Sequence, residues 1–179
     1  MHMIEMEAKT TDRANERGTS RESVLSWLKF LLFIAAIFFI FRFAIGITVI
    51  SGNSMAPTIQ DRTIIVTSNL LYSPELNDII QFEDVNGFDV IKRIIAMPND
   101  TVEINNGHLY VNGQMLEEDY AMGVPNDMAL VTVPEGAYFV VGDNRTPGES
   151  LDSRNVEFGF IPKERIKGEM LFSLFPFEF

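Results

Sequence analysis

A long apolar run near the N-terminus constrains this chain of 179 residues more than any other feature. Residues 24–50 are almost entirely apolar, and twelve apolar residues follow one another without interruption between Lys29 and Arg42. A helix needs about 20 apolar residues to cross the hydrocarbon core of a bilayer, and residues 27–47 supply them. The sequence therefore predicts a transmembrane anchor over residues 24–50, with the lipid bilayer as its partner.

The charges that flank this anchor predict its orientation. Basic residues precede the uninterrupted apolar stretch, among them Arg13, Arg17, Arg21 and Lys29. After Arg42, by contrast, the next basic residue is Arg62. Because basic flanks remain on the cytoplasmic side, residues 1–23 are expected to be a cytoplasmic tail, disordered or weakly helical. The rest of the chain is then expected outside the cytoplasm, in a single-pass protein of the cell membrane.

A cleaved secretory leader is the alternative interpretation of the same run. Ala44, Ile45 and Gly46 form a small-x-small triplet of the kind found at leader cleavage sites. The apolar stretch is longer than the core of about 7–15 residues that is typical of such leaders. Its length favours an anchor that is retained.

The remaining chain is strongly acidic. Residues 51–179 carry eight Lys or Arg and twenty Asp or Glu, so their net charge is -12. A body of this charge repels phosphates, and a nucleic acid is therefore not expected as a partner. The chain has no cysteine, and no cluster of potential ligands accompanies His2 or His108. We therefore expect neither a metal nor a cofactor.

The pattern of residues 51–179 predicts a mainly β domain. Short β-branched or aromatic segments alternate with Gly, Pro and Asn, and no helical stripe is present. The segments begin about ten residues apart, which favours an antiparallel barrel or packed antiparallel sheets. A small inserted cap region is expected at about 102–136. The expected strands are 62–67, 78–82, 89–95, 101–104, 108–111 and 137–141.

Ser54 lies in a turn-forming segment, residues 51–58, directly after the anchor. Gly52 and Asn53 permit a tight turn. A serine nucleophile needs its hydroxyl exposed on such a turn, beside a backbone N–H that can hold an oxyanion. On its own, the segment also fits a plain loop next to the membrane.

Lys92 lies within the expected strand 89–95. Side chains alternate between the two faces of a strand, so Lys92 points the same way as Val90 and Ile94. Burial among aliphatic groups lowers the pKa of a lysine. To act as a general base at neutral pH, a lysine needs a pKa about three units below its usual value of about 10.4. A lysine that protects an edge strand against aggregation gives the same pattern.

A third polar cluster comprises residues 142–145 and 152–154, and on its own it fits a turn with a salt bridge. No histidine is placed for a Ser-His-Asp triad. If Ser54 is a nucleophile, a lysine is the natural remaining base.

These clusters occur in a fixed order after one apolar segment, and in this the sequence resembles type I signal peptidases. The resemblance is to the small single-span enzymes of Gram-positive bacteria, and it extends from the anchor to the C-terminus. The segments that carry it are residues 51–58, 77–82, 92–100, 142–145, 150–154 and the aromatic ending 172–179.

The resemblance implies a serine endopeptidase that removes signal peptides from secreted preproteins at the outer face of the cytoplasmic membrane. It implies that Ser54 is the nucleophile and Lys92 the general base. Supporting roles fall to Met55, Ser150, Asp152 and Arg154, with Ser150 helping to position the lysine amine. It also implies small side chains at the -1 and -3 positions of the substrate and shallow apolar subsites. The secretion translocon is a further partner under this interpretation.

Three features depart from the family pattern. Ala96 and Asn99 stand where glycines are usual, and residues 146–149 lengthen the last conserved segment by two residues. Gly52 replaces a hydroxyl residue that completes the oxyanion hole in some relatives. The backbone N–H of Ser54 is therefore expected to do more of that task.

Two rival functions remain open. The first is a self-cleaving Ser-Lys protease of the repressor kind, against which the membrane segment and the absence of a DNA-binding segment argue. The second is a catalytically silent, membrane-anchored relative that acts as an assembly partner. Retention of both Ser54 and Lys92 argues against a silent relative.

Overall fold

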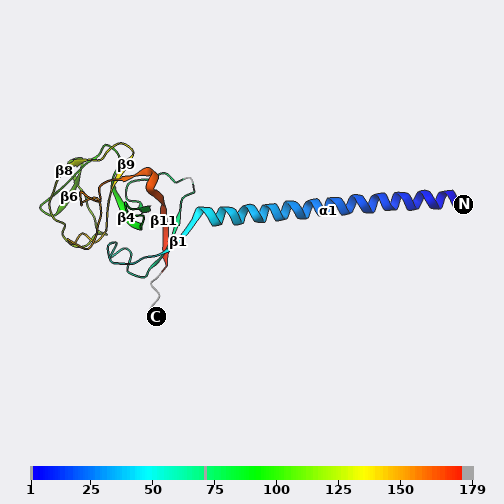
Figure 1. The fold of residues 1–179 in the computed structure, drawn as a ribbon, viewed down its shortest axis with the longest axis horizontal. Coiled ribbons are helices and arrows are strands. Elements are labelled where there is room, and N and C mark those ends of the chain that lie inside the picture. Colours follow the sequence, from blue (N-terminus) through cyan, green and yellow to red (C-terminus); the bar gives the residue numbers. More distant parts are fainter. Residues whose placement is uncertain (1, 71, 175–179) are drawn as a thin grey trace. The chain divides into compact units, whose positions relative to one another are not determined.

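A computed structural model describes the backbone of residues 2–70 and 72–174, and the side chains of residues 22–42, 44–70 and 72–174. The chain divides into two compact units, Met1–Phe43 and Ala44–Phe179. The first unit belongs to a single helix, α1 (His2–Ala44), which Figure 1 shows as one uninterrupted element.

Helix α1 contains one segment, Glu22–Arg42, that is long and apolar enough to cross a membrane. Its backbone is also helical over residues 2–23, where the sequence suggested a disordered or weakly helical tail. The helix ends at Ala44, within the anchor expected over residues 24–50, because Ile45–Val49 form strand β1. Three of these five residues are β-branched aliphatics and one is glycine, a composition that disfavours helix and favours strand.

The second unit is built from antiparallel strands and one short 3₁₀ turn, η1 (Lys163–Arg165). The mainly β architecture predicted from the sequence is confirmed. After β1, the strands are β2 (Ile64–Ser68), β3 (Ile79–Glu83), β4 (Asp89–Ala96), β5 (Thr101–Asn105), β6 (His108–Val111), β7 (Gln114–Met115), β8 (Met128–Thr132), β9 (Ala137–Val141), β10 (Ile161–Pro162) and β11 (Ile166–Leu174).

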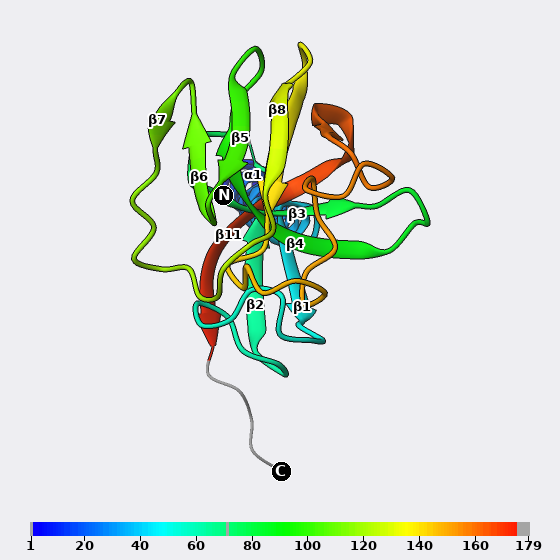
Figure 2. The ribbon, with the colours of Figure 1, turned by 90° about the vertical axis from the view of Figure 1, so that its left-hand side faces the viewer.

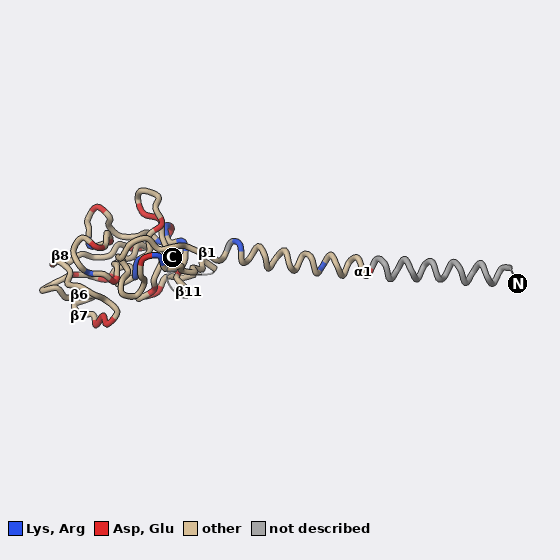
Figure 3. Tube along the Cα trace, turned by 90° about the horizontal axis from the view of Figure 1, so that it is seen from below, with Lys and Arg blue, Asp and Glu red and all other residues tan. Residues whose placement is uncertain are grey.

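These strands form two sheets. The larger has the order β1-β2-β11-β3-β4-β9-β10 and the smaller the order β7-β6-β5-β8. Figure 2 shows β5, β6, β7 and β8 grouped on one side of the body. The smaller sheet occupies the stretch where the sequence suggested an inserted cap at about 102–136. Acidic residues lie in several separate loops of the body (Figure 3).

The sequence did not predict β11, which joins the two halves of the larger sheet. It pairs with β2 through Leu174 and Ile64, and with β3 through Ile166 and Phe82. Its register shifts between Met170 and Phe172 and again between Ile166 and Gly168. These irregularities break the alternation of apolar and polar residues on which strand prediction depends.

Three apolar clusters make up the core. One joins the two sheets and includes Phe139 of β9 and Val102 of β5. A second lies around Phe82 and Phe158, whose rings meet edge to face. The third holds the segment around Ser54 against the larger sheet, and its buried members are Met55, Ile59, Ile65, Ile79 and Ile91.

Replacing Phe139 by Ala should lower the free energy of unfolding by about 3–5 kcal/mol, because it leaves a cavity between the two sheets. The matched variant is Phe88→Ala, since Phe88 is 68% exposed and Phe139 is fully buried. It should change stability by less than about 0.5 kcal/mol. Denaturant unfolding of the detergent-solubilised chain measures both. Equal losses in the two variants would contradict this assignment of the core.

Candidate active site

The segment that carries Ser54 is fixed at both ends. Beyond β1, the Ile50 N–H donates to the Thr63 carbonyl at 2.8 Å, and the Arg62 N–H donates to the Ile50 carbonyl at 2.9 Å. Within the loop so closed, the Met55 side chain is 1% exposed and packs in the third core cluster. The adjacent Ser54 remains partly exposed. The family resemblance implied a supporting role for Met55, and this residue anchors the turn that presents the serine.

Ser54 and Lys92 meet in the folded body. The Lys92 Nζ lies 2.8 Å from the Ser54 Oγ and donates a hydrogen bond to it, and it donates another to the Ile91 carbonyl at 3.0 Å. Lys92 comes from β4, which lies between β3 and β9 in the interior of the larger sheet. The edge-strand interpretation of this lysine is therefore wrong.

The environment of Lys92 favours its neutral form. The side chain is only 3% exposed, and burial lowers the pKa of Lys92 to about 8. The nearby charges partly cancel, because Asp152 and Asp143 raise this pKa while Arg154 lowers it. With a pKa of about 8, about one tenth of the amine is neutral at pH 7. An amine of this kind can accept a proton from a hydroxyl at hydrogen-bond distance.

The loop after β9 fixes the backbone of Ser54. The Asn144 N–H donates to the Ser54 carbonyl at 3.0 Å, and the Asn144 side-chain amide donates to the Asn53 carbonyl at 3.3 Å. Gly142 lies so close that a Cβ there would be 2.3 Å from the Ser54 carbonyl oxygen. Only glycine fits at this position without a shift of the backbone. The carbonyl of Ser54 is thus held, while its N–H donates to no acceptor among the described residues.

The backbone at Gly52 explains why no hydroxyl residue stands there. Its φ is +103°, a conformation that other L-residues rarely adopt, and its N–H donates to the Asp61 carboxylate at 2.7 Å. A serine at this position would be strained. Within the described loop, the Ser54 N–H is the backbone donor best placed beside the nucleophile for an oxyanion.

A second acid, Asp143, ties three segments of the site together. It accepts two hydrogen bonds from Arg93 of β4, at 2.9 and 2.7 Å, and one from the Thr58 hydroxyl at 2.5 Å. The Arg93 guanidinium lies 4.1 Å above the ring centre of Tyr120. Sequence reasoning gave none of these residues a role, although Arg93 directly follows Lys92 and Asp143 lies in the third polar cluster.

Asp152 organises the last polar segment. It accepts two hydrogen bonds from Arg154, at 2.8 and 2.7 Å, and one from the Gly142 N–H at 3.0 Å. Burial alone would raise the pKa of Asp152, but the hydrogen bonds and charge of Arg154 hold it below its usual value. Ser150 also donates to Asp152, at 2.6 Å. Among the described residues it makes no hydrogen bond with Lys92, so it does not position the amine by a direct hydrogen bond.

Ser54 and Lys92 open into a cleft of about 300 Å³, which we call the catalytic cleft. Apolar side chains form much of its wall, which also includes the carboxylates of Asp84 and Asp89. No group of three or more potential metal ligands occurs in the described part of the chain. The residues that line the cleft are Thr48, Val49, Ile50, Ser51, Ser54, Met55, Asp84, Asp89, Val90, Ile91, Lys92, Leu151 and Phe158.

Comparison with known proteins gives one consistent result. The family described as signal peptidase, peptidase S26, matches residues 24–175. A probable signal peptidase I-1 of Synechocystis is 40% identical over 140 residues, covering 71% of this chain and 69% of the relative. Signal peptidase I S of Bacillus subtilis is 34% identical over 181 residues, covering 91% of this chain and 95% of the relative. A crystal structure of a signal peptidase I from Enterococcus faecalis is 36% identical, covers 55% of this chain and 97% of its own, and has a TM-score of 0.48.

Replacing Asp152 by Asn should cost about 3–5 kcal/mol of unfolding free energy at pH 7, because Arg154 loses its buried partner. The pKa of this carboxyl is lowered by folding, so its contribution is present above the unfolded value of about 3.9. This stabilising contribution is lost as the pH falls through the lower pKa that the carboxyl has in the folded state. Denaturant unfolding from pH 7 to pH 3 should therefore show the unfolding free energies of the unmodified chain and the variant converging. Asp119→Asn, at an exposed aspartate, is the control. A difference in unfolding free energy between the unmodified chain and Asp152→Asn that does not depend on pH would refute the prediction.

Proposed function

Because the chain belongs to the signal peptidase family, peptidase S26, we propose that it removes N-terminal signal peptides from secreted preproteins with Ser54 as nucleophile and Lys92 as general base. The observation that carries this proposal is the 2.8 Å contact between the Ser54 hydroxyl and the amine of a buried lysine. The other lysines with described side chains, Lys29, Lys163 and Lys167, are exposed.

Acylation begins from neutral Lys92. The Ser54 hydroxyl donates its proton to the Lys92 Nζ as its oxygen attacks the scissile carbonyl. The Ser54 N–H stabilises the negative charge that develops on the carbonyl oxygen. The Lys92 ammonium then gives its proton to the leaving nitrogen. The new N-terminus of the mature protein departs, and the signal peptide remains as an ester on Ser54.

Deacylation uses the same lysine a second time. Neutral Lys92 accepts a proton from a water molecule, whose oxygen attacks the ester. The Ser54 oxygen leaves and regains a proton from Lys92. The signal peptide is released with a new C-terminal carboxylate, and both residues return to their starting protonation states.

The catalytic cleft suits the residues that precede the cleavage site. Val49, Ile50, Val90 and Ile91 give it apolar walls. Walls of this kind favour small apolar side chains, in agreement with the preference at the -1 and -3 positions that the family resemblance implies. An extended peptide that lies along β4 would place its scissile carbonyl at Ser54.

The segment Glu22–Arg42 supports an enzyme anchored in the cell membrane. The basic residues before it favour an N-terminus in the cytoplasm and a catalytic domain outside. A signal peptide occupies the same bilayer while it is cleaved. Anchoring therefore raises the effective concentration of enzyme and substrate, and it makes the secretion translocon a neighbour at the time of cleavage.

Ser54→Ala and Lys92→Ala should each lower kcat for a preprotein with an Ala-X-Ala site by at least about 10²–10⁴-fold, because the nucleophile or its base is lost. Gel analysis of preprotein cleavage by the detergent-solubilised chain measures this effect. Lys163→Ala, at an exposed lysine, is the matched control and should retain activity. Full cleavage by either dyad variant would reject the dyad. No cleavage by the unmodified chain would favour a silent assembly partner.

The pH dependence of kcat/KM should follow the ionisation of Lys92. Only the neutral amine can accept the serine proton, and its pKa is about 8. We therefore expect kcat/KM to rise about tenfold per pH unit well below pH 8 and to level off above it. Initial rates with a fluorogenic peptide between pH 6 and pH 10 measure the profile. A profile that falls with rising pH in this range would contradict a neutral lysine base.

A further inference from the structure

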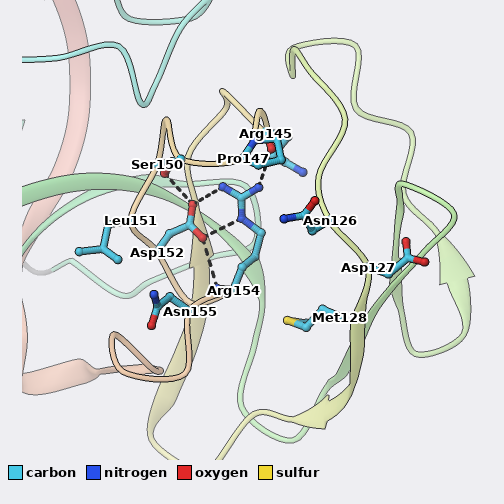
Figure 4. Close-up of a pocket in the computed structure, with 11 residues that line it drawn as sticks. Asn126, Asp127, Met128, Arg145, Pro147, Ser150, Leu151, Asp152, Arg154 and Asn155 are labelled. Atoms are coloured by element: carbon cyan, nitrogen blue, oxygen red, sulfur yellow. Dashed lines mark hydrogen bonds and ion pairs between the residues drawn. The ribbon is translucent and has the colours of Figure 1, made fainter.

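A second cavity, of about 340 Å³, lies beside the last polar segment. Its volume is within the range of about 300–1,000 Å³ that is usual for ligand pockets. Figure 4 shows Asp127 and Met128 on one side of it and Leu151 and Asp152 on the other. We call it the polar pocket, and it is lined by Asn126, Asp127, Met128, Arg145, Pro147, Gly148, Ser150, Leu151, Asp152, Arg154 and Asn155.

The polar pocket adjoins the catalytic cleft. Leu151 lines both cavities, and its side chain is 57% exposed. Ser150, in the wall of the polar pocket, and the Ser54 carbonyl both lie against Gly142, where a Cβ would be 2.4 and 2.3 Å from their oxygens. The exposed Leu151 side chain is therefore a wall that the nucleophile's cleft and the second cavity share.

The two cavities differ in chemistry as the two halves of a preprotein differ. The catalytic cleft combines aliphatic side chains with the carboxylates of Asp84 and Asp89. Seven of the eleven residues that line the polar pocket are polar or charged. A signal peptide ends in small, mostly apolar residues, while the mature segment that follows begins a soluble secreted protein. An endopeptidase must accommodate both halves, one on each side of its nucleophile.

Most of the charged side chains that line the polar pocket are neutralised by ion pairs. Arg154 pairs with Asp152 at 2.7 Å, as the dashed lines in Figure 4 show, and Arg145 pairs with Glu118 at 2.6 Å. Asp127 differs from these, because its carboxylate accepts only a 3.2 Å hydrogen bond from the Gly107 N–H among the described residues. It forms no ion pair with any described residue. The pocket thus presents one uncompensated negative charge in its lining.

The lengthened turn supplies part of the same wall. Pro147 and Gly148 belong to the two-residue extension noted in the sequence, and both line the polar pocket. The turn is closed by the Glu149 N–H, which donates to the Thr146 carbonyl at 3.2 Å. The feature that departs from the family pattern is therefore a wall of this cavity.

We infer that the polar pocket binds the leaving segment of the substrate, the first few residues after the scissile bond, and that Asp127 disfavours acidic residues there. This inference rests on the proposed function, because it needs a substrate that extends on both sides of Ser54. A basic residue in the leaving segment gains an ion pair with Asp127, and an acidic residue meets a like charge.

Matched peptides test the inference in the full chain in detergent. They share one signal-side sequence and carry Lys, Asn or Asp at each position from +1 to +4, and a second set carries the same changes at -2 and -4. The measured quantity is the ratio of kcat/KM for the Lys peptide to that for the Asp peptide. The enzymes are the unmodified chain, Asp127→Asn and the control Glu135→Gln, whose exposed side chain lines neither cavity.

In the unmodified chain we expect a ratio of about two- to fivefold at one or two of the positions +1 to +4, the size of an accessible ion pair. Asp127→Asn should bring this ratio to about one, and Glu135→Gln should leave the ratio unchanged. High salt should reduce the ratio in the unmodified chain. A ratio of one in the unmodified chain, or a ratio that Asp127→Asn preserves, would overturn the inference. An Asp127 effect at -2 or -4 instead would overturn it as well. No cleavage of any peptide would reject the proposed function itself.

Discussion

The contact between the Ser54 hydroxyl and the Lys92 amine depends on keeping a lysine out of water. An ammonium is costly to bury, so a lysine in the interior of a sheet tends to lose its proton. Here β4 lies between two other strands, and Met55 and Ile91 pack beneath the serine turn. The same apolar cluster therefore positions the hydroxyl and supports the strand that carries the amine beside it.

The loop between β9 and β10 completes the site through three buried ion pairs. Arg93 pairs with Asp143, Arg145 with Glu118, and Arg154 with Asp152. Buried pairs add little net stability compared with apolar packing, but breaking one leaves an unpaired buried charge. Their arrangement restricts the loop to one conformation. In that conformation Asn144 and Gly142 contact the carbonyl of the serine.

Much of the fold and the centre of the site were predictable from the sequence. Alternation and turn residues predicted most strands of the larger sheet, and the order of the polar clusters predicted which serine and which lysine meet. Strand β1 was missed because its apolar, β-branched residues continue the composition of the anchor. The sequence does not contain the reason that the helix ends at Ala44, since β1 forms by pairing with the distant β2.

Tertiary contacts decided the remaining parts of the site. Asp143 and Arg93 are far apart in the chain, and only the folded sheet makes them partners. Ser150 was expected to contact the lysine amine, but its hydroxyl donates to the carboxylate of Asp152, a strong acceptor. Alternation within a strand indicates the direction of Lys92, but its burial depends on the segments that cover that face.

Direct titration of Lys92 is the measurement that tests the central claim most closely. The chain has five lysines, so lysine labelled with ¹³C at Cε should give five NMR signals, and Lys92→Ala identifies one of them. The structure predicts that this signal titrates with a pKa of about 8, in the unmodified chain and in Ser54→Ala, since burial is the main cause. The exposed lysines should titrate near about 10.4. A Lys92 signal that titrates with them would contradict the account of a buried, neutral base.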